Sequence, residues 1–212
     1  MDIADFRKEY TRGGLSRREV PDDPSLLFGR WLEEAIVAEL PEPNAMLLAT
    51  ASVECRPSAR TVLLKGFEDG KFLFFTNYES RKGRQIAGNP HVSLSFVWLP
   101  LERQVHVEGT AAPLPAVESD AYFDSRPYGS RIGALVSPQS RVIPSRHELV
   151  RRFDEAFDAY RHRPLLRPSC WGGYAVTPQR YEFWQGRENR LHDRILYVLQ
   201  SDGDWRIERL AP

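Results

Sequence analysis

Hydrophobic and polar residues alternate with a period of two along much of the chain, which is typical of β-strands. The clearest case is residues 91–98, where every second position from Val92 to Trp98 is hydrophobic. Asp69-Gly70 and Ser201-Asp202-Gly203 are turn signals between such runs. The same reasoning predicts further strands at 45–52, 58–65, 71–77, 102–112, 171–177, 180–185, 195–200 and 204–210.

Helical patterns are fewer. Asp23-Pro24 is a good helix start, and it predicts a helix over residues 24–40. Ser80 is expected to cap a short helix over 80–87. Ser145 and Glu148 form a capping box inside a stretch, 115–160, that is helical in character. The apolar face of the first helix is expected to comprise Leu27, Trp31, Ile36 and Leu40.

Consecutive strands joined by short turns indicate an antiparallel sheet rather than a strand–helix alternation. The expected fold class is therefore mainly β with flanking helices (α+β), with the sheet curled into a small barrel. Residues 1–22 are polar and charged, and we interpret them as an arm that lies on the body of the protein or on a partner subunit. A length of 212 residues fits one domain over residues 23–212.

The net charge and the cysteine content exclude several classes of function. Lys and Arg total 29, as do Asp and Glu, so the net charge is zero, which argues against a general nucleic-acid binder or a polybasic membrane anchor. Cys55 and Cys170 are not in a CxxC pair, and no metal-ligand spacing is visible. No apolar run is long enough for a membrane span, and the first residues do not resemble a signal peptide, so we expect a cytoplasmic protein without a metal.

Common phosphate loops and hydrolase motifs are absent from the sequence. Arg81 and Lys82 follow the expected cap Ser80, with Thr76 upstream, and could form an anion site or simply a solvated helix start. Arg60 and Lys65 lie at the two ends of one strand, where alternation places them on opposite faces; two solvated charges are the alternative. Gln139-Ser140 is a polar loop pair that is weak evidence alone.

The densest cluster of chemical groups is residues 181–194. If this stretch is extended, Arg190, His192 and Arg194 point the same way and could grip an anion. An ion-pair cluster involving Glu182, Glu188 and Asp193 is an equally good interpretation.

The segment EFWQGRENRLHDR, residues 182–194, resembles the signature of the pyridoxine/pyridoxamine 5′-phosphate oxidase family. The resemblance extends over nearly the whole chain. Its further segments are RKEYTRGGL, RTVLLK, TNYESRK, NPHVSLSF, LERQVHVEG, YFDSRP, SPQS, SCWGGY and RLAP, in that order.

This resemblance implies an FMN-binding split barrel that works as a homodimer with the flavin at the subunit interface. It also implies oxidation of pyridoxamine 5′-phosphate or pyridoxine 5′-phosphate to pyridoxal 5′-phosphate, with hydride transfer to FMN and reoxidation by O₂. Phe75 stands where a tyrosine is often found. The implied FMN contacts are Arg60, Thr61, Val62, Leu63, Leu64, Lys65, Phe75, Thr76, Arg81, Lys82, Gln104, Gln139, Ser140, Trp184 and Arg194.

Substrate contacts are implied in the same way, and Arg190 and His192 are expected to cover the reacting face of the substrate ring. Whether His192 moves a proton or only orients the ring stays open, as does the preferred substrate. Another flavin oxidoreductase on the same barrel and a non-catalytic carrier are the alternatives. Arg17, Arg18 and Arg209 are either a second phosphate site or solvated charges. The implied substrate contacts are Arg7, Lys8, Glu9, Tyr10, Lys65, Tyr122, Arg126, Ser130, Arg190, Leu191 and His192.

Overall fold

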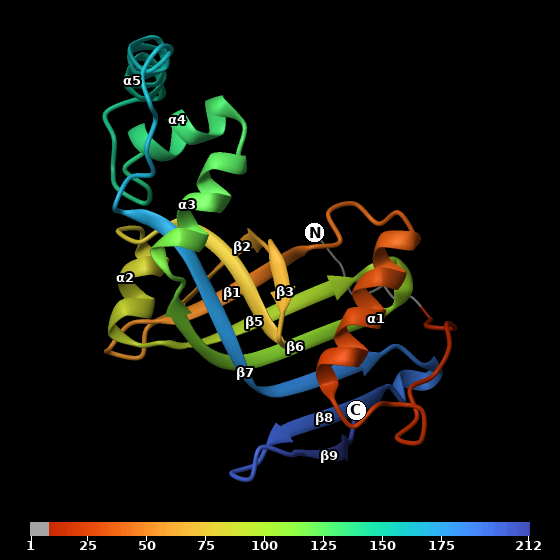
Figure 1. The fold of residues 1–212 in the computed structure, drawn as a ribbon. Helices are drawn as coiled ribbons and strands as arrows, with labels where there is room; N and C mark the ends of the chain where they lie inside the picture. Colours follow the sequence, from red (N-terminus) through yellow and green to blue (C-terminus); the bar gives the residue numbers. More distant parts are fainter. Residues whose placement is uncertain (1–8) are drawn as a thin grey trace.

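The computed structural model describes residues 9–212, and Figure 1 shows its elements. Among these residues no helix is both long and apolar enough to cross a membrane. The helices are α1 (Pro24–Val37), α2 (Arg81–Gly88), α3 (Ala116–Ser125), α4 (Tyr128–Val136) and α5 (Arg146–Ala159), with short 3₁₀ turns η1 (Leu99–Leu101) and η2 (Glu188–Arg190). The strands are β1 (Ala45–Ala51), β2 (Pro57–Leu63), β3 (Gly66–Glu68), β4 (Lys71–Asn77), β5 (His91–Trp98), β6 (Arg103–Pro113), β7 (Trp171–Gln185), β8 (Asp193–Leu199) and β9 (Trp205–Leu210).

Within residues 9–212, nine strands form one antiparallel sheet in the order β2-β1-β5-β6-β7-β4-β3, with β8 paired to β7 and β9 paired to β8. The sheet is curled and α1 packs against one side of it (Figure 1), so the predicted mainly-β fold with flanking helices is confirmed. Buried residues alternate in β5 from Val92 to Trp98, as the sequence pattern predicts. The inner face of the curled sheet therefore forms the main hydrophobic core with α1.

Strand β7 corrects the sequence prediction of two separate strands at 171–177 and 180–185. It is one strand of 15 residues that pairs with β6 along nearly its whole length, with β4 near its start and with β8 near its end. Gly109 lies opposite Pro178, and the register shifts there, which is a β-bulge. A side chain at Gly109 would overlap the carbonyl oxygen of Thr177, so the bulge needs glycine at this position.

The prediction for α1 is correct for its start and partly wrong for its face. The Asp23 side chain accepts a hydrogen bond from the Ser25 N–H, and Leu27 and Trp31 are buried. Ile36, which was expected in the core, is 56% exposed, and Ala35 takes its place. Four residues after Trp31 the helix returns to the same face, whereas five residues overshoot it.

Helices α3, α4 and α5 project from one end of the sheet (Figure 1) and confirm the helical character of residues 115–160. Phe123, Ile132, Leu165 and Trp171 form a second hydrophobic cluster between these helices and the start of β7. The short strand β3 was expected to be only a turn, but the Asp69-Gly70 turn after it is confirmed by positive φ angles of 49° and 72°.

Candidate cofactor and substrate site

Three cations meet where α2 begins beside β2. Lys82 is 8% exposed, and its Nζ donates to Thr76 Oγ1 at 3.0 Å and to Gln139 Oε1 at 2.9 Å. Burial, and then the charge of Arg60, lower the pKa of Lys82 from 10.5 to about 8. Burial, and then the charge of Arg81, also lower the pKa of Arg60. These shifts mean that the cations repel one another and have lost solvent.

The cluster has no negative partner in the part of the chain that the structure describes. None of the ion pairs within residues 9–212 involves Arg60, Arg81 or Lys82. Ser80 caps α2 by accepting a hydrogen bond from the Gly83 N–H, as expected, so free backbone N–H groups also lie at this helix start. A buried cation without a counter-charge is costly, and a phosphate would supply the missing charge. The residues therefore fit the phosphate of a nucleotide cofactor.

A second cationic group lies between α3 and the start of β7. The Arg126 guanidinium lies 4.6 Å from the centre of the Trp171 ring, and burial lowers its pKa. Its Nη1 atom is buried and has no hydrogen-bond partner among the described residues. Tyr122 stacks on Phe75, with ring centres 3.8 Å apart. An unsatisfied guanidinium nitrogen beside aromatic rings suits an anionic ligand that carries a ring.

A row of side chains crosses the sheet near the end of β7. Gln104 pairs with Trp184, and Trp184 pairs with Arg194, on three adjacent strands. Arg194 Nε donates to Glu182 at 2.8 Å, and Arg194 Nη1 donates to the Ala211 carbonyl at 2.7 Å. The sheet register thus brings together three of the residues that the family resemblance implies.

The loop after β7 corrects one expectation. Residues Glu188–Arg190 form a 3₁₀ turn in which Asn189 and Arg190 have φ angles of 54° and 62°. Because the stretch is not extended, Arg190 does not share a strand face with His192 and Arg194. The ion-pair interpretation holds for two of its three acidic residues: Glu182 pairs with Arg194, and Asp193 pairs with Arg187 and Arg209.

The loop selects one tautomer of the neutral His192 ring. Its Nδ1 accepts a hydrogen bond from the Arg187 backbone N–H at 3.1 Å, so Nδ1 carries no proton and Nε2 carries it. Burial, and then the charge of Arg190, lower the pKa of His192 below its usual value. Its ring packs near Trp184, at 4.7 Å, and near Tyr10, at 5.5 Å between centres.

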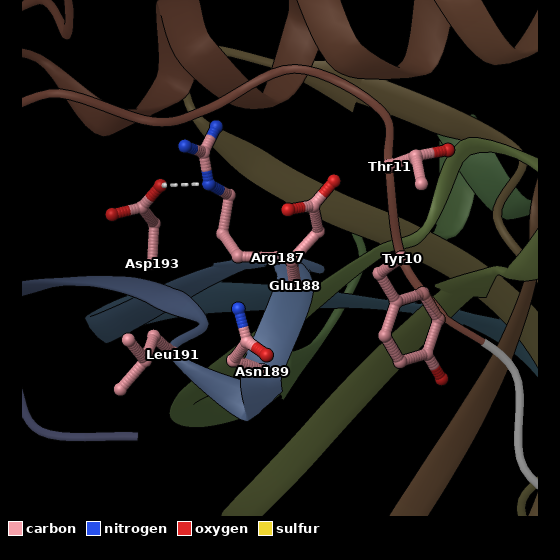
Figure 2. A pocket seen from close by; sticks show the side chains of 7 residues that line it. All are labelled: Tyr10, Thr11, Arg187, Glu188, Asn189, Leu191 and Asp193. Atoms are coloured by element: carbon pink, nitrogen blue, oxygen red, sulfur yellow. Dashed lines mark ion pairs between the residues drawn. The ribbon is translucent and has the colours of Figure 1, made fainter.

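A pocket of about 400 Å³ opens beside this loop. Figure 2 shows its lining: Tyr10 and Thr11 come from the arm, while Arg187, Glu188, Asn189, Leu191 and Asp193 come from the loop and β8.

The arm is held in place at several points over residues 9–22. Asp193 Oδ2 accepts from the Leu15 N–H at 3.0 Å, Glu102 Oε2 accepts from the Arg12 N–H at 3.0 Å, and Tyr197 donates to the Pro21 carbonyl at 2.8 Å. The described part of the arm thus lies on its own chain. Arg7 and Lys8 lie outside the described residues. Glu9 is exposed, and no contact of its side chain is described.

Two of the three basic residues left open by the sequence have side-chain partners, whereas Arg18 is exposed and no contact of its side chain is described. Arg209 pairs with Asp193 and donates to the Leu15 carbonyl, and Arg17 pairs with Asp22 at 3.5 Å. These contacts occupy the guanidinium groups in the protein itself, which argues for a structural role rather than a second phosphate site.

The candidate residues therefore form three groups in one chain. Arg60, Thr76, Lys82 and Gln139 form the first; Phe75, Tyr122 and Arg126 form the second; and Gln104, Trp184, His192 and Arg194 form the third. The first lies near the start of β7, where Thr76 pairs with Gly172, and the third lies at its end. The two groups thus lie near opposite ends of a strand of 15 residues, which argues against one chain uniting them.

Several candidates stand apart from these contacts. Leu64 is buried in the core, whereas Thr61, Lys65, Ser130 and Ser140 are exposed. Sequence reasoning missed Thr50 and Ser58, which accept hydrogen bonds from the Arg60 guanidinium, and Gln85, which contacts both hydroxyls. The available signal for Thr50 and Ser58 was a polar residue at an inward-facing strand position, whereas Gln85 lies on α2.

The family model described as pyridoxamine 5′-phosphate oxidase matches residues 32–160, more than half of the 212 residues. The chain belongs to this family. A second model, described as the C-terminal dimerisation region of pyridoxine 5′-phosphate oxidase, matches residues 171–212.

Relatives of this oxidase family match over the full chain. A pyridoxine/pyridoxamine 5′-phosphate oxidase from Bacteroides thetaiotaomicron is 61% identical and is covered to 99%, with 100% of this chain aligned. One from Rubrobacter xylanophilus is 57% identical, with 97% of it and 100% of this chain aligned. The crystal structure of PhzG from Burkholderia lata, in complex with tetrahydrophenazine-1-carboxylic acid, has a TM-score of 0.89 at 30% identity and covers 95% of this chain and 99% of that one.

Proposed function

We infer that this protein oxidises pyridoxamine 5′-phosphate and pyridoxine 5′-phosphate to pyridoxal 5′-phosphate, with FMN as its cofactor. The observation that carries this conclusion is the 61% identity, over the whole length, to a relative named for that activity. The site agrees with it, because two separate cationic groups lack carboxylate partners among residues 9–212. Two ligands that each bear a phosphate, the cofactor and the substrate, would satisfy both groups.

We propose that the FMN phosphate binds Arg60, Arg81 and Lys82. Arg60 and Lys82 are held by neutral groups, so a phosphate can bind them without breaking an ion pair. When bound, FMN supplies the redox chemistry, accepting hydride from the substrate and passing electrons to O₂ to give H₂O₂. The proposed contacts remain Arg60, Thr61, Val62, Leu63, Leu64, Lys65, Phe75, Thr76, Arg81, Lys82, Gln104, Gln139, Ser140, Trp184 and Arg194.

The substrate phosphate is proposed to bind Arg126, whose Nη1 lacks a partner among the described residues, with Lys65, Tyr122 and Ser130. His192 is proposed to orient the substrate rather than to remove a proton. Its Nδ1 is already used as an acceptor, which leaves only the Nε2–H to face a ligand at neutral pH. Burial, and then the positive charge of Arg190, favour the neutral imidazole by lowering its pKa, and the same charge can attract the anionic substrate.

The arm and the partner subunit complete the proposal. Residues 1–22, including Arg7, Lys8, Glu9 and Tyr10, are proposed to cover the substrate and exclude water, and residues 23–212 to form a single domain. A homodimer would bring the Trp184–Arg194 group of one subunit to the Arg60–Lys82 group of the other, and the match to a dimerisation region supports it. A cytoplasmic location is also proposed, and the two unpaired cysteines are compatible with it.

The test measures oxygen consumption and H₂O₂ with each phosphorylated vitamin and with FMN present. Turnover with either substrate is the expected result. A protein that binds FMN and pyridoxal 5′-phosphate but makes no H₂O₂ would be a carrier. The fold similarity to PhzG favours one specific rival, an oxidase of reduced phenazine carboxylates, and turnover of such a compound without turnover of the vitamins would replace our conclusion.

A further inference from the structure

Arg60 is held by a polar network that reaches into α2. Its guanidinium donates to Thr50 Oγ1 at 2.7 Å and to Ser58 Oγ at 2.6 Å. Both hydroxyl groups also contact Gln85 Oε1, at 2.6 Å and 2.7 Å. Thr50 and Ser58 are direct partners on β1 and β2, so the two hydroxyls lie side by side between Arg60 and the helix.

The direction of each hydrogen bond in this network is determined. Gln85 Nε2 donates to the Arg56 carbonyl at 3.3 Å, and since a carbonyl can only accept, the amide oxygen of Gln85 must face the hydroxyls. Each hydroxyl has one proton, which goes to this oxygen. The hydroxyls of Thr50 and Ser58 therefore present lone pairs to Arg60, which can only donate.

This arrangement fixes the guanidinium without neutralising it. Gln85 is 8% exposed, and its amide is neutral, whereas a glutamate would accept the same bonds and add a negative charge. Gln139 holds Lys82 in the same way, through an amide oxygen. Both cations are thus positioned by neutral acceptors, so their charge stays available for an anion.

We propose that Gln85 is a positioning residue for cofactor binding: its neutral side-chain amide, through Thr50 and Ser58, aims the Arg60 guanidinium at the phosphate of FMN while leaving its positive charge uncompensated. This inference rests on the proposed function, because it takes the anion to be the FMN phosphate. It differs from a simple packing role, because it assigns the effect of Gln85 to the phosphate and not to the rest of the flavin.

The test compares FMN with riboflavin, which has the same ring system but no phosphate. Dissociation constants are measured by flavin fluorescence for the wild type and for Gln85→Glu. We expect Gln85→Glu to weaken FMN binding by about tenfold or more, because a carboxylate would pair with the cations. Riboflavin binding should change less than about threefold. Gln200→Glu, which adds the same charge in the β8–β9 turn, is the matched control and should change neither constant.

A second variant covers the case in which Gln85→Glu does not fold. Ser58→Ala removes one of the two hydroxyls that hold Arg60 and should weaken FMN more than riboflavin. Equal losses for the two ligands, or no loss in either variant, would overturn the inference and leave Gln85 a packing residue. If wild-type protein binds riboflavin as tightly as FMN, the proposed phosphate site itself is wrong, which is a separate result.

Discussion

Replacing Lys82 with methionine should stabilise the FMN-free protein at neutral pH while weakening its binding of FMN. Methionine keeps much of the length of the side chain and removes the charge. Burial and Arg60 lower the pKa of Lys82 from 10.5 to about 8, so at pH 7 the folded chain keeps a proton in a site that opposes it. Methionine carries no charge, so it removes the cost of burying the ammonium and its repulsion by Arg60.

The size of the effect follows from the pKa shift. Its free energy is about 2 kcal/mol once solvent screening around the ammonium is allowed for. Methionine also loses the hydrogen bonds to Thr76 and Gln139, at a cost of about 1 kcal/mol. The expected net gain in the free energy of unfolding is about 1 kcal/mol at pH 7. The lost phosphate contact should weaken FMN binding about ten- to hundredfold.

The pH dependence separates this explanation from a simple gain in packing. The folded-state pKa of Lys82 lies below its unfolded value, so between about pH 8 and 10.5 the unfolded chain binds more protons. Wild-type stability should therefore rise in this window, and the advantage of the methionine variant should fade.

Urea denaturation of the FMN-free proteins at pH 7 and pH 10, with flavin fluorescence titrations, measures both effects. Lys71→Met, at an exposed lysine on β4, is the control. A variant less stable than wild type at pH 7, or equally favoured at pH 10, would refute the reasoning.

Three shorter predictions follow from the loop after β7 and from the bulge. Arg190→Ala should lower kcat in the oxygen-consumption assay while the FMN dissociation constant stays unchanged; an unchanged kcat would show that Arg190 does not act on the substrate. Activity should fall on the acid side with a midpoint below the usual histidine value of about 6.5, because protonated His192 can no longer accept the Arg187 N–H; a midpoint near pH 7.5 in the pH–rate profile would contradict this. Gly109→Ala should lower the free energy of unfolding by about 1–3 kcal/mol in urea, because its side chain would overlap Thr177, and unchanged stability would mean that the bulge tolerates a side chain.

The strands were predictable because burial follows alternation in the sequence. In β5 and β6 the hydrophobic positions are the buried ones, and the period of two suffices to assign them. The continuity of β7 was not predictable from the sequence, because Pro178 interrupts the alternation of hydrophobic and polar residues. The strand continues past Pro178 because Gly109 on β6 pairs with it through a bulge. The prediction that Ile36 is buried is wrong for a different reason. Ile36 lies five residues after Trp31, and a step of five residues does not return to the same face of a helix.

Individual residues of the candidate site were predictable from the sequence, but the loop conformation and the hydrogen bonds between them were not. The N-cap Ser80 marks the start of α2, and this places Arg81 and Lys82 in the first turn of the helix, where an anion site was predicted. The backbone of Arg190 was not predictable, because a positive φ angle in an arginine depends on the surrounding loop. The network around Gln85 joins β1, β2 and α2, and a local sequence pattern cannot predict contacts between separate elements.

One carboxylate ties the first described segment to the last strand. Asp193 accepts from the Leu15 N–H and pairs with Arg209 on β9, while Arg209 donates to the Leu15 carbonyl. Burial works to raise the pKa of Asp193, but the bonds from Leu15 and Arg209 hold it below its ordinary value. Protonation of Asp193 at acid pH therefore weakens its contacts with Leu15 and Arg209 together. Fraying of β9 and release of residues 9–22 should therefore be a single cooperative event. Amide hydrogens at both places would then exchange with solvent at a shared rate.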